Sequence, residues 1–468
     1  MSNRPRVQRM SGPGPAARQK DPSTVQFAAP AQYPTDTQPA FTGEAAITEV
    51  LDLALRVGEV LLSSGAATAD VTADILAITS TFGLPRCEVD ITFTAISVSA
   101  HRGLSSPPAN TMRVVNYRSL DYTRLAEVDR VVRSAQAGQL TARQAHGELD
   151  RITTAPHPYR RWVATLAWSA MAASIALLVG GGWLVCAVAF LSAVVIDRTK
   201  RVLNRTGLPF FFQQVVGGFI ATLPAALLFA AQDVIHITVF PSQVAAAGVI
   251  VLLSGLSLVG SMQDAITGAM VTASARLLEV LTLTAGIIVG VGLALKVASG
   301  VGVQLPELGA STTALSQLPV QVLAAAGSGA FFALACYAER RALLFAAAAG
   351  AAGFTVFGLL QQIAGGTLMA SAAAATFVGL AGGVLSKRYR LPPLVIAVSG
   401  ITPLLPGLAV YRGLSAMINN DPVTGLSEMS AALAIGAALA SGVVLGEWMA
   451  KPLRAKPAHT LASRAAAG

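Results

Sequence analysis

Two prolines interrupt an apolar stretch in a way that could expose backbone groups inside a membrane. The stretch Gly400–Gly413 reads GITPLLPGLAVYRG. Pro403 and Pro406 have no backbone N–H, so each leaves a carbonyl of the preceding turn without its helical partner. Because such backbone is tolerated in a membrane only where it faces protein or water, the stretch predicts a cavity that can bind a polar solute. A proline kink that only shapes helix packing is the alternative.

A second stretch, Gly255–Gly268, resembles the first when the two are aligned without gaps. It reads GLSLVGSMQDAITG and lies 145 residues earlier in the chain. Gly255 then meets Gly400, and Ser257 meets Thr402. Few positions are identical, and apolar helices resemble one another by chance. A matching break in each half of the chain nevertheless favours the cavity over the simple kink.

Side chains beside these two breaks are candidates for contacts with a solute. Arg412 has a planar two-donor fork that matches a carboxylate, although it could equally anchor a helix end among lipid headgroups. Tyr411 is more typical of the aromatic belt at a membrane surface, and it is kept as a second candidate. The candidate hydroxyl groups belong to Thr402, Thr267, Thr272 and Ser274.

Three charged residues lie in or near apolar segments of the first half. Asp264 follows the first break, while Arg276 and Glu279 are three residues apart and share one helix face. Charges inside a membrane span are functional candidates by default, so Asp264 or Glu279 is a candidate proton carrier, with Arg276 as its partner. The alternative is an Arg276–Glu279 ion pair that only holds helices together.

A further helix break is expected in the segment Phe210–Pro224, which reads FFFQQVVGGFIATLP. Pro224 and Thr222 are expected to interrupt this helix in its middle. The glycine pair Gly217-Gly218 is best explained by close helix packing.

The composition indicates a polar N-terminal part joined to an integral membrane part. The chain has 468 residues, of which 53% are hydrophobic and only 12% charged. The charged residues concentrate before Trp162. The net charge of +9 does not indicate nucleic-acid binding, because the basic residues also lie in short loops between apolar spans. Cys87, Cys186 and Cys336 are widely separated, so we expect neither a metal site nor a disulfide framework, and no cofactor.

Ten apolar segments are long enough to be considered as membrane spans. They lie near 163–180, 182–197, 209–231, 241–260, 265–295, 319–338, 341–360, 366–386, 392–411 and 429–450. Lys and Arg gather in the loops after the second, sixth and eighth spans and in the C-terminal tail, which favours cytoplasmic N- and C-termini. Ten spans divide into two sets of five, and an odd number per set makes the repeats inverted. Inverted repeats with discontinuous helices are typical of secondary transporters.

The part before the first span predicts a disordered tail and a small folded domain. Residues 1–43 are rich in Pro, Ala, Gln and Arg and contain no signal-peptide core. Residues 44–160 predict an α+β cytoplasmic domain: helices over 44–65 and 68–82, strands within 87–100 and 110–117, and helices near 121–137 and 141–153. The polar residues Asp70, Asp74, Glu88, Asp90 and His101 raise the possibility of a hydrolase. No nucleophile elbow, metal spacing or phosphate loop supports it, and a regulatory or structural role is preferred.

Taken together, several motifs resemble the threonine/serine exporter family of actinobacteria. They are LLSSGAATADV, FFFQQVVGGFIATLPA, QDAITGAMVTASAR, GITPLLPGLAVYRG and SGVVLGEW, and the resemblance runs from about Glu44 to Lys451. It implies a multi-pass plasma-membrane protein with ten helices and a cytoplasmic N-terminal domain. It also implies export of threonine and serine driven by the proton motive force, by a transporter and not an enzyme. The family has two parts, which would be fused here near Leu305–Gln317.

The predicted spans, together with the fusion point that the resemblance implies, give the full domain division that we expect. A first five-helix half spans 161–304, a connecting loop 305–318, a second five-helix half 319–451, and a basic cytoplasmic tail 452–468. It brings no agreed binding residues, so the candidate site rests on chemistry. Arg412 would meet the amino acid's carboxylate, Asp264 or Glu279 its ammonium group or the proton, and a candidate hydroxyl its side chain. The expected partners are an amino acid, protons and the lipid bilayer, with the oligomeric state left open.

Three other functions remain open at this point. The chain could be a channel or carrier for another small polar solute, because inverted repeats alone do not separate channels from carriers. It could be a membrane-anchored hydrolase acting through the N-terminal domain. It could also be a structural protein, although the intramembrane charges and paired breaks argue against that reading.

Overall fold

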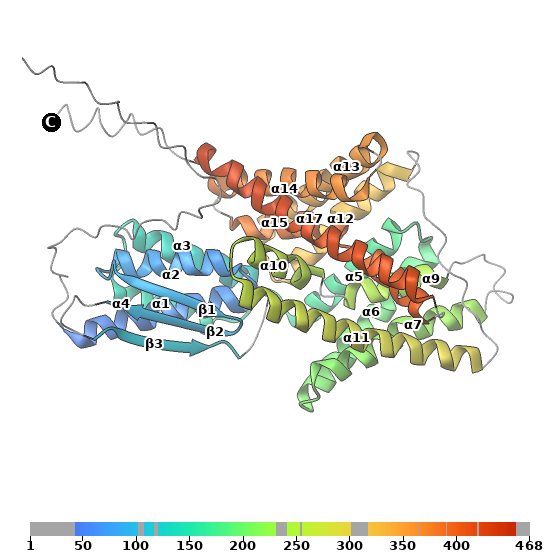
Figure 1. Cartoon of the computed structure of the whole chain (residues 1–468), viewed down its shortest axis with the longest axis horizontal. Helices are drawn as coiled ribbons and strands as arrows, with labels where there is room; N and C mark the ends of the chain where they lie inside the picture. Colours follow the sequence, from blue (N-terminus) through green and yellow to red (C-terminus); the bar gives the residue numbers. More distant parts are fainter. Residues whose placement is uncertain are drawn as a thin grey trace, which may run out of the picture. The chain divides into compact units, whose positions relative to one another are not determined.

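The computed structural model describes residues 43–101, 107–116, 120–230, 241–252, 255–300, 317–364, 366–389, 391–418 and 421–454. Nearly all of the expected tail 1–43 and of the connecting loop 305–318, and most of the basic tail 452–468, lie outside these residues. The described chain is mostly helical, with one small sheet near its N-terminus (Figure 1).

Residues 43–154 are called here the N-terminal section, and their described part holds four helices and three strands. The helices are α1 (Glu44–Ser63), α2 (Thr68–Thr81), α3 (Tyr122–Gln136) and α4 (Ala142–Thr154), and the strands are β1 (Cys87–Thr92), β2 (Ala95–Ala100) and β3 (Ala109–Val114). The strands form one antiparallel sheet in the order β1-β2-β3. These elements lie close to the predicted helices and strands.

Local sequence explains where the helices of the N-terminal section begin. Asp121 accepts the backbone N–H groups of Thr123 and Arg124 at the start of α3, and Thr141 forms a capping box with Gln144 at the start of α4. The start of α2 is different, because its N-cap residue Ala67 has no side-chain acceptor. The N–H groups of that first turn need a partner from elsewhere.

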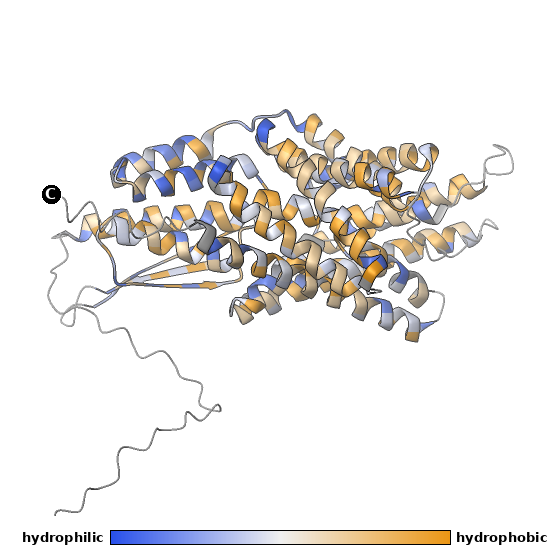
Figure 2. Cartoon of the chain, turned by 90° about the horizontal axis from the view of Figure 1, so that it is seen from above, coloured by the Kyte–Doolittle hydropathy of each residue, from blue (hydrophilic) through white to orange (hydrophobic). Residues whose placement is uncertain are grey.

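The rest of the described chain is a bundle of long apolar helices. These are α5 (Arg161–Leu178), α6 (Trp183–Arg205), α7 (Phe210–Ala230), α9 (Pro241–Leu252), α10 (Gly255–Ile266), α11 (Met270–Gly300), α12 (Leu318–Ala335), α13 (Arg340–Ala364), α14 (Thr367–Tyr389), α15 (Pro393–Ile401), the 3₁₀ turn η2 (Thr402–Leu404), α16 (Gly407–Ile418) and α17 (Pro422–Arg454). Figure 2 shows that apolar residues dominate these helices along their length, in contrast to the mixed N-terminal section.

Seven of these helices are long and apolar enough to cross a membrane, or up to nine if each of two bent helix pairs counts as one span. Both bent pairs lie where the sequence predicts breaks. Gln243–Leu252 and Ser257–Ile266 meet at 49°, and Pro393–Leu404 and Gly407–Gly413 meet at 41°. The expected total of ten would also require α6, which does not meet the same criteria of length and composition. The described helices therefore indicate a multi-pass membrane protein.

The break expected at Pro224 is not present. α7 continues as one helix from Phe210 to Ala230 with Pro224 inside it. Proline prevents one backbone hydrogen bond, but the surrounding helices hold this segment straight enough to stay helical. Close packing does occur at the preceding glycine pair, because a Cβ on Gly218 would lie 2.6 Å from the carbonyl oxygen of Ile287 in α11.

The two ends of the helical bundle differ in what they contact. The backbone N–H of Tyr122 donates to the carbonyl of Cys336, just after α12, at 2.9 Å. That of Thr68 donates to Asp264 at the end of α10 at 3.0 Å. The end of the bundle that carries Asp264 and Cys336 and contacts the N-terminal section is called the near end, and the opposite end is called the far end. Since successive helices alternate in direction, α12, α14 and α17 begin at the far end.

Candidate functional site

The second predicted break forms the floor of a cavity. α15 ends at Ile401, Thr402–Leu404 form a 3₁₀ turn, and Leu405 adopts an extended backbone before α16 begins at Gly407. The missing N–H groups of Pro403 and Pro406 explain why the α-helix cannot continue here. All five residues from Thr402 to Pro406 line the cavity, as the sequence predicts for broken backbone in a membrane.

This cavity, called the far-end cavity, has a volume of about 640 Å³. Its walls come from the far ends of several helices: α5 and α9 of the first half, and α12, α13, α14, α16 and α17 of the second. The apolar lining includes Phe354, Phe357 and Ile250. A pocket with apolar walls and a few placed polar groups is the usual form of a small-molecule site.

Charges of both signs line the far-end cavity. Arg412 of α16 and Glu428 of α17 both contribute to its wall, and each side chain is partly buried. The described helical section contains few charged side chains, so their occurrence at one cavity is informative. A zwitterion carries a carboxylate and an ammonium group, which these two side chains match in sign.

Uncharged polar groups complete the wall. Thr402 is 5% exposed and its hydroxyl donates to the Val398 carbonyl at 2.8 Å. Ser371 of α14 is 1% exposed. Gln321 of α12 is 8% exposed, and among the described residues its Oε1 atom has no hydrogen-bond partner. A buried acceptor without a partner loses the free energy of its hydration, so Gln321 is suited to receive a donor from a bound molecule.

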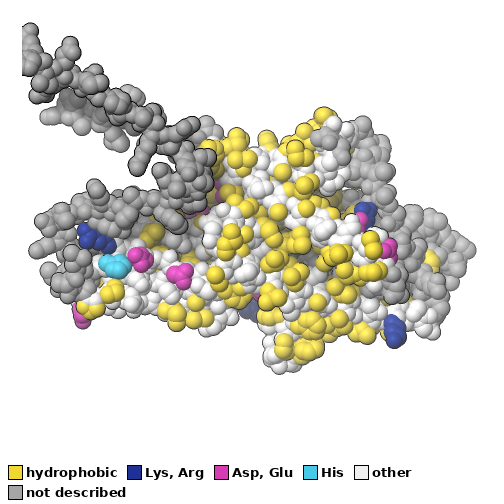
Figure 3. Space-filling view, viewed as in Figure 1, with side chains coloured by type: hydrophobic (Ala, Val, Ile, Leu, Met, Phe, Trp, Pro, Cys, Tyr) yellow, Lys and Arg dark blue, Asp and Glu magenta, His cyan; other side chains and the backbone are white. Residues whose placement is uncertain are grey.

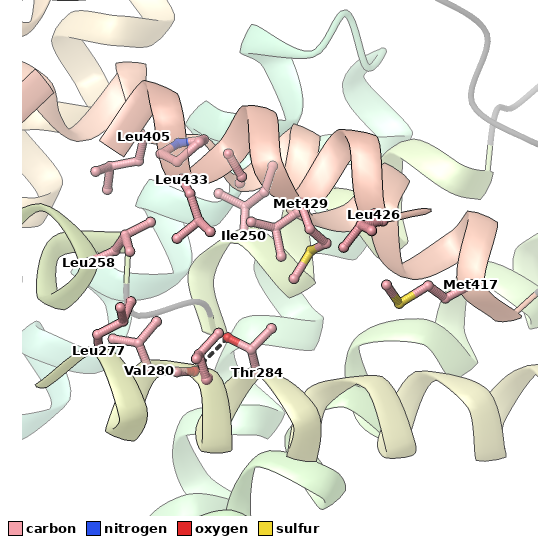
Figure 4. A pocket seen from close by; sticks show the side chains of 15 residues that line it. Ile250, Leu258, Leu277, Val280, Thr284, Leu405, Met417, Leu426, Met429 and Leu433 are labelled. Atoms are coloured by element: carbon pink, nitrogen blue, oxygen red, sulfur yellow. Dashed lines mark hydrogen bonds between the residues drawn. The ribbon is translucent and has the colours of Figure 1, made fainter. Parts of the chain in front are cut away.

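A second pocket lies on the other side of the floor and is almost wholly apolar (Figure 4). Its volume is about 290 Å³, and it shares Ile250, Leu405 and Pro406 with the far-end cavity. The hydroxyl of Thr284, which also lines it, donates to the Val280 carbonyl at 2.7 Å. With so little polar lining, this pocket offers little to orient a polar solute.

The candidates of the first half lie elsewhere, at the near end. Oδ2 of Asp264 lies 2.6 Å from Nη1 of Arg276, and the two side chains are 0% and 10% exposed. Oδ1 of Asp264 accepts the Thr68 N–H, so this carboxylate is the missing cap of α2. Arg276 is thus an ion partner of Asp264.

The proposed hydroxyl role of Thr272 is not supported by its position. Its Oγ1 donates to the Ile91 carbonyl at 2.8 Å and accepts the Phe93 N–H at 3.0 Å. Both contacts join α11 to the N-terminal section. Thr267 and Ser274 donate to carbonyls of their own chain segment, those of Gln263 and Val271. None of these three residues lines the far-end cavity.

Two other predicted residues, Tyr411 and Glu279, lie outside the lining of the far-end cavity. Tyr411 is 9% exposed within α16, next to Arg412, and it does not line the far-end cavity. Glu279 is partly buried in α11, also away from that cavity. Gly400 packs tightly, since a Cβ there would lie 2.4 Å from Val378, while Gly255 begins α10 after its break.

Sequence reasoning missed Glu428, Gln321 and Ser371. Glu428 lies at the boundary of the tenth predicted span, and an acidic residue at the edge of an apolar segment was a usable signal. Gln321 and Ser371 give no such signal, because single amides and hydroxyls are common in membrane helices. Their importance depends on which helix face meets the cavity.

The surface of the helical section is consistent with lipid contact. Figure 3 shows hydrophobic side chains spread over its visible face, with few charged groups among them. Large apolar side chains such as Leu323, Leu344 and Val423 are at least 71% exposed. Such a surface is costly in water and favourable in a bilayer.

Two family models match the chain. One, described as "Putative threonine/serine exporter", covers residues 52–298, and the other, described as "Threonine/Serine exporter, ThrE", covers residues 321–449. No solved structure matches the chain.

Two curated proteins are similar over most of their length. A protein of Corynebacterium glutamicum named "Threonine/serine exporter" is 42% identical over 438 residues, covering 93% of this chain and 89% of that protein. A protein of Mycobacterium tuberculosis named "Probable threonine/serine exporter" is 45% identical over 417 residues, covering 87% of this chain and 77% of that protein. The chain, with the far-end cavity and broken helix described above, therefore belongs to the threonine/serine exporter family.

Proposed function

We propose that the chain is a secondary active exporter of threonine and serine in the plasma membrane, and that the far-end cavity is its substrate site. The observation that carries the binding site is the combination of broken backbone, Arg412, Glu428 and the unpartnered Gln321 around one cavity of about 640 Å³. The names of the similar proteins support the substrate class. Membership of an exporter family supports a transporter and not an enzyme.

In the proposed binding mode the two charges of the amino acid set its orientation. Arg412 receives the carboxylate through its two-donor fork, and Glu428 receives the ammonium group. The side-chain hydroxyl of threonine or serine can then donate to Oε1 of Gln321, which satisfies that buried acceptor. Thr402 and Ser371 supply further hydroxyl groups on the wall.

The proposed topology has ten spans in two inverted five-helix repeats, with both termini and the N-terminal section on the cytoplasmic side. The two bent helix pairs support the repeat, because each is the fourth span of its half. The loop charges after the predicted second, sixth and eighth spans support the orientation. In this topology the far-end cavity faces outward, as a releasing state of an exporter would.

We further propose that the proton motive force drives export. Asp264 and Glu279 are the acidic candidates of the first half, and Glu279, which is partly buried in α11, is the one that we assign to the proton. Replacing Glu279 by glutamine should abolish the dependence of transport on the pH gradient without abolishing exchange. If Glu279→Gln keeps the full gradient dependence, Glu279 is not the proton carrier.

The substrate site is tested by uptake of labelled threonine into proteoliposomes with an imposed pH gradient. Hydrogen bonds to charged groups contribute about 1.5–3 kcal/mol, so Arg412→Ala or Glu428→Gln should raise the apparent KM about 10- to 100-fold. Arg412→Lys should recover only part of the loss, because lysine keeps the charge without the fork.

Lys296→Ala is the matched control. Lys296 is an exposed cation of α11 toward the far end and does not line the cavity. Its removal should leave the KM unchanged. Normal transport by both Arg412→Ala and Arg412→Lys would refute the proposed carboxylate contact, and lack of threonine uptake by folded wild-type protein would refute the substrate assignment.

A further inference from the structure

Several buried polar side chains of the second half, and one of the N-terminal section, have an atom without a hydrogen-bond partner in the described part of the chain. Among the described residues, such atoms include Oε1 of Gln321, Oγ of Ser328, Oγ of Ser399 and the hydroxyl oxygen of Tyr122. Their side chains are between 0% and 8% exposed. Buried polar groups are nearly always paired, so a cluster of unpaired ones requires an explanation.

The polar residues of this set lie in a row along one face of α12, and the row continues through Phe332 to Tyr122. Gln321, Ser328 and Phe332 are spaced by seven and four residues and share one face of α12. Ser399 of α15 lies beside this face, because a Cβ on Gly329 would be 2.9 Å from the Ser399 carbonyl oxygen. At the near end Phe332 makes an edge contact with the ring of Tyr122, with centroids 6.2 Å apart.

The residue at each end of this row lines a cavity, Gln321 at the far end and Tyr122 at the near end. The far-end cavity reaches Gln321 and Thr402. A near-end cavity of about 40 Å³ reaches Tyr122, Val398 and Ile401. This volume admits water but not an amino acid. Ile401, which lines the near-end cavity at the end of α15, and Thr402, which lines the far-end cavity, are consecutive residues.

Other buried serines of the membrane helices behave differently. The hydroxyl of Ser169 in α5 donates to the Thr165 carbonyl at 2.9 Å, and that of Ser192 in α6 donates to the Val188 carbonyl at 2.8 Å. A serine hydroxyl in a helix can thus donate its hydrogen bond to a backbone carbonyl of the preceding turn. Ser328 and Ser399 do not, although each lies in a helix.

We propose that the two cavities are the ends of one translocation path between α12 and α15, closed in this structure at Ser328 and Ser399. This inference rests on the proposed function and adds the route that the hydroxy amino acid takes. When the path opens, its polar groups and accompanying water satisfy the two serine hydroxyls. In the closed state the hydroxyls are left without partners because the helices meet across them.

The near-end cavity shows what must move for the path to open on that side. Ser64, Gly65, Leu120 and Tyr122 of the N-terminal section form part of its wall. The segments that carry them are held to the bundle by the Thr68–Asp264 and Tyr122–Cys336 hydrogen bonds. The N-terminal section therefore covers the near mouth of the path.

Cysteine labelling during transport tests the path. In a background that lacks Cys87, Cys186 and Cys336, the variants Ser328→Cys and Ser399→Cys are reconstituted in vesicles. They are treated with a small charged methanethiosulfonate reagent while threonine is transported. Ser169→Cys is the matched control, because Ser169 is equally buried, at 0% exposure, but lies on α5 with its hydroxyl paired.

We expect both path cysteines to react at least about tenfold faster than Ser169→Cys, because an open state populated at about 1–10% exposes them, whereas Ser169 needs local unfolding. Saturating threonine should slow the reaction. Labelling no faster than that of Ser169→Cys, in vesicles that transport threonine, would overturn the path. Absence of threonine uptake in the cysteine-free parent, when the intact wild type also fails, would instead refute the proposed function.

Alanine variants keep the proposal testable if the cysteine variants do not fold. Ser328→Ala and Ser399→Ala should melt at the same temperature as the wild type or higher, because each removes an unpaired hydroxyl, while maximal transport falls severalfold. Ser169→Ala should leave transport unchanged. A fall in melting temperature with unchanged transport per folded molecule would mean that the two hydroxyls are structural, and the path would be wrong.

Discussion

Replacing Asp264 should weaken the junction between the N-terminal section and the helical bundle. This carboxylate is fully buried, lies 2.6 Å from the guanidinium of Arg276 and accepts the first N–H of α2 at 3.0 Å. Removing one partner of a buried ion pair typically costs about 3–5 kcal/mol, because the other charge stays buried. Asp264→Ala should therefore lower the free energy of unfolding by about that amount.

Asp264→Asn should lower the free energy of unfolding by less than Asp264→Ala does, because an amide oxygen can still accept the Thr68 N–H. The pair is best measured by a double-mutant cycle with Asp264→Ala, Arg276→Met and the combined variant, using unfolding of the purified protein in mixed micelles. We expect the free energy of unfolding to fall in the double variant by about 0.5–3 kcal/mol less than the sum of the falls in the two single variants. The combined change removes both charges of the Asp264–Arg276 pair.

The outcome also decides between two roles for Asp264. If the falls in the free energy of unfolding caused by Asp264→Ala and Arg276→Met simply add in the double variant, the two residues do not stabilise each other. The structural reasoning is then wrong. If Asp264→Asn retains wild-type stability but loses the dependence of transport on the pH gradient, Asp264 is the proton carrier and not a junction residue. Transport by the folded fraction, normalised to protein, separates these outcomes.

Two further predictions concern the cavity and the N-terminal section. Gln321→Met should weaken discrimination between threonine and 2-aminobutyrate in competition assays, because methionine has a similar volume but no acceptor for the hydroxyl. An equal loss of affinity for both compounds would mean that Gln321 binds the ammonium group instead. Burial, followed by the like charges of Asp129 and Asp70, raises the pKa of Asp74 from 3.8 to about 6. Because Asp74 ionises near 3.8 in the unfolded chain and near 6 in the folded one, stability falls as the pH rises from about 4 to about 6, and the full loss is present above pH 6. Asp74→Asn should therefore raise the melting temperature at pH 7.5 and have little effect below about pH 4, where Asp74 is protonated in both states. An equal increase at both pH values would exclude the electrostatic cause.

The described elements show which features local sequence can determine. The helices and strands of the N-terminal section, the apolar helices and both breaks follow from periodicity, proline and hydropathy. Pro224 is the exception, because a single proline removes one hydrogen bond and the neighbouring helices can still hold the segment helical. Pro403 and Pro406, three residues apart, remove two and do end the α-helix.

The site was only partly determined by the sequence. Broken backbone and Arg412 were identifiable because a proline pair and an arginine in apolar surroundings stand out by type alone. Asp264 and Thr272 have equally suggestive types, yet their contacts are with Thr68, Ile91 and Phe93, between 179 and 196 residues away. No local pattern in the sequence specifies such contacts.

Sequence by itself thus determined the membrane class, the family resemblance and the position of the broken helix, since all three depend on residue type and local spacing. Only the tertiary structure decided which polar residues share a cavity and which join the N-terminal section to the bundle. The physical reason is that a helix presents different faces to different neighbours, and packing alone selects the face that meets the cavity. Gln321, Ser371 and Glu428 come from three separate helices, and only that packing brings them to one wall.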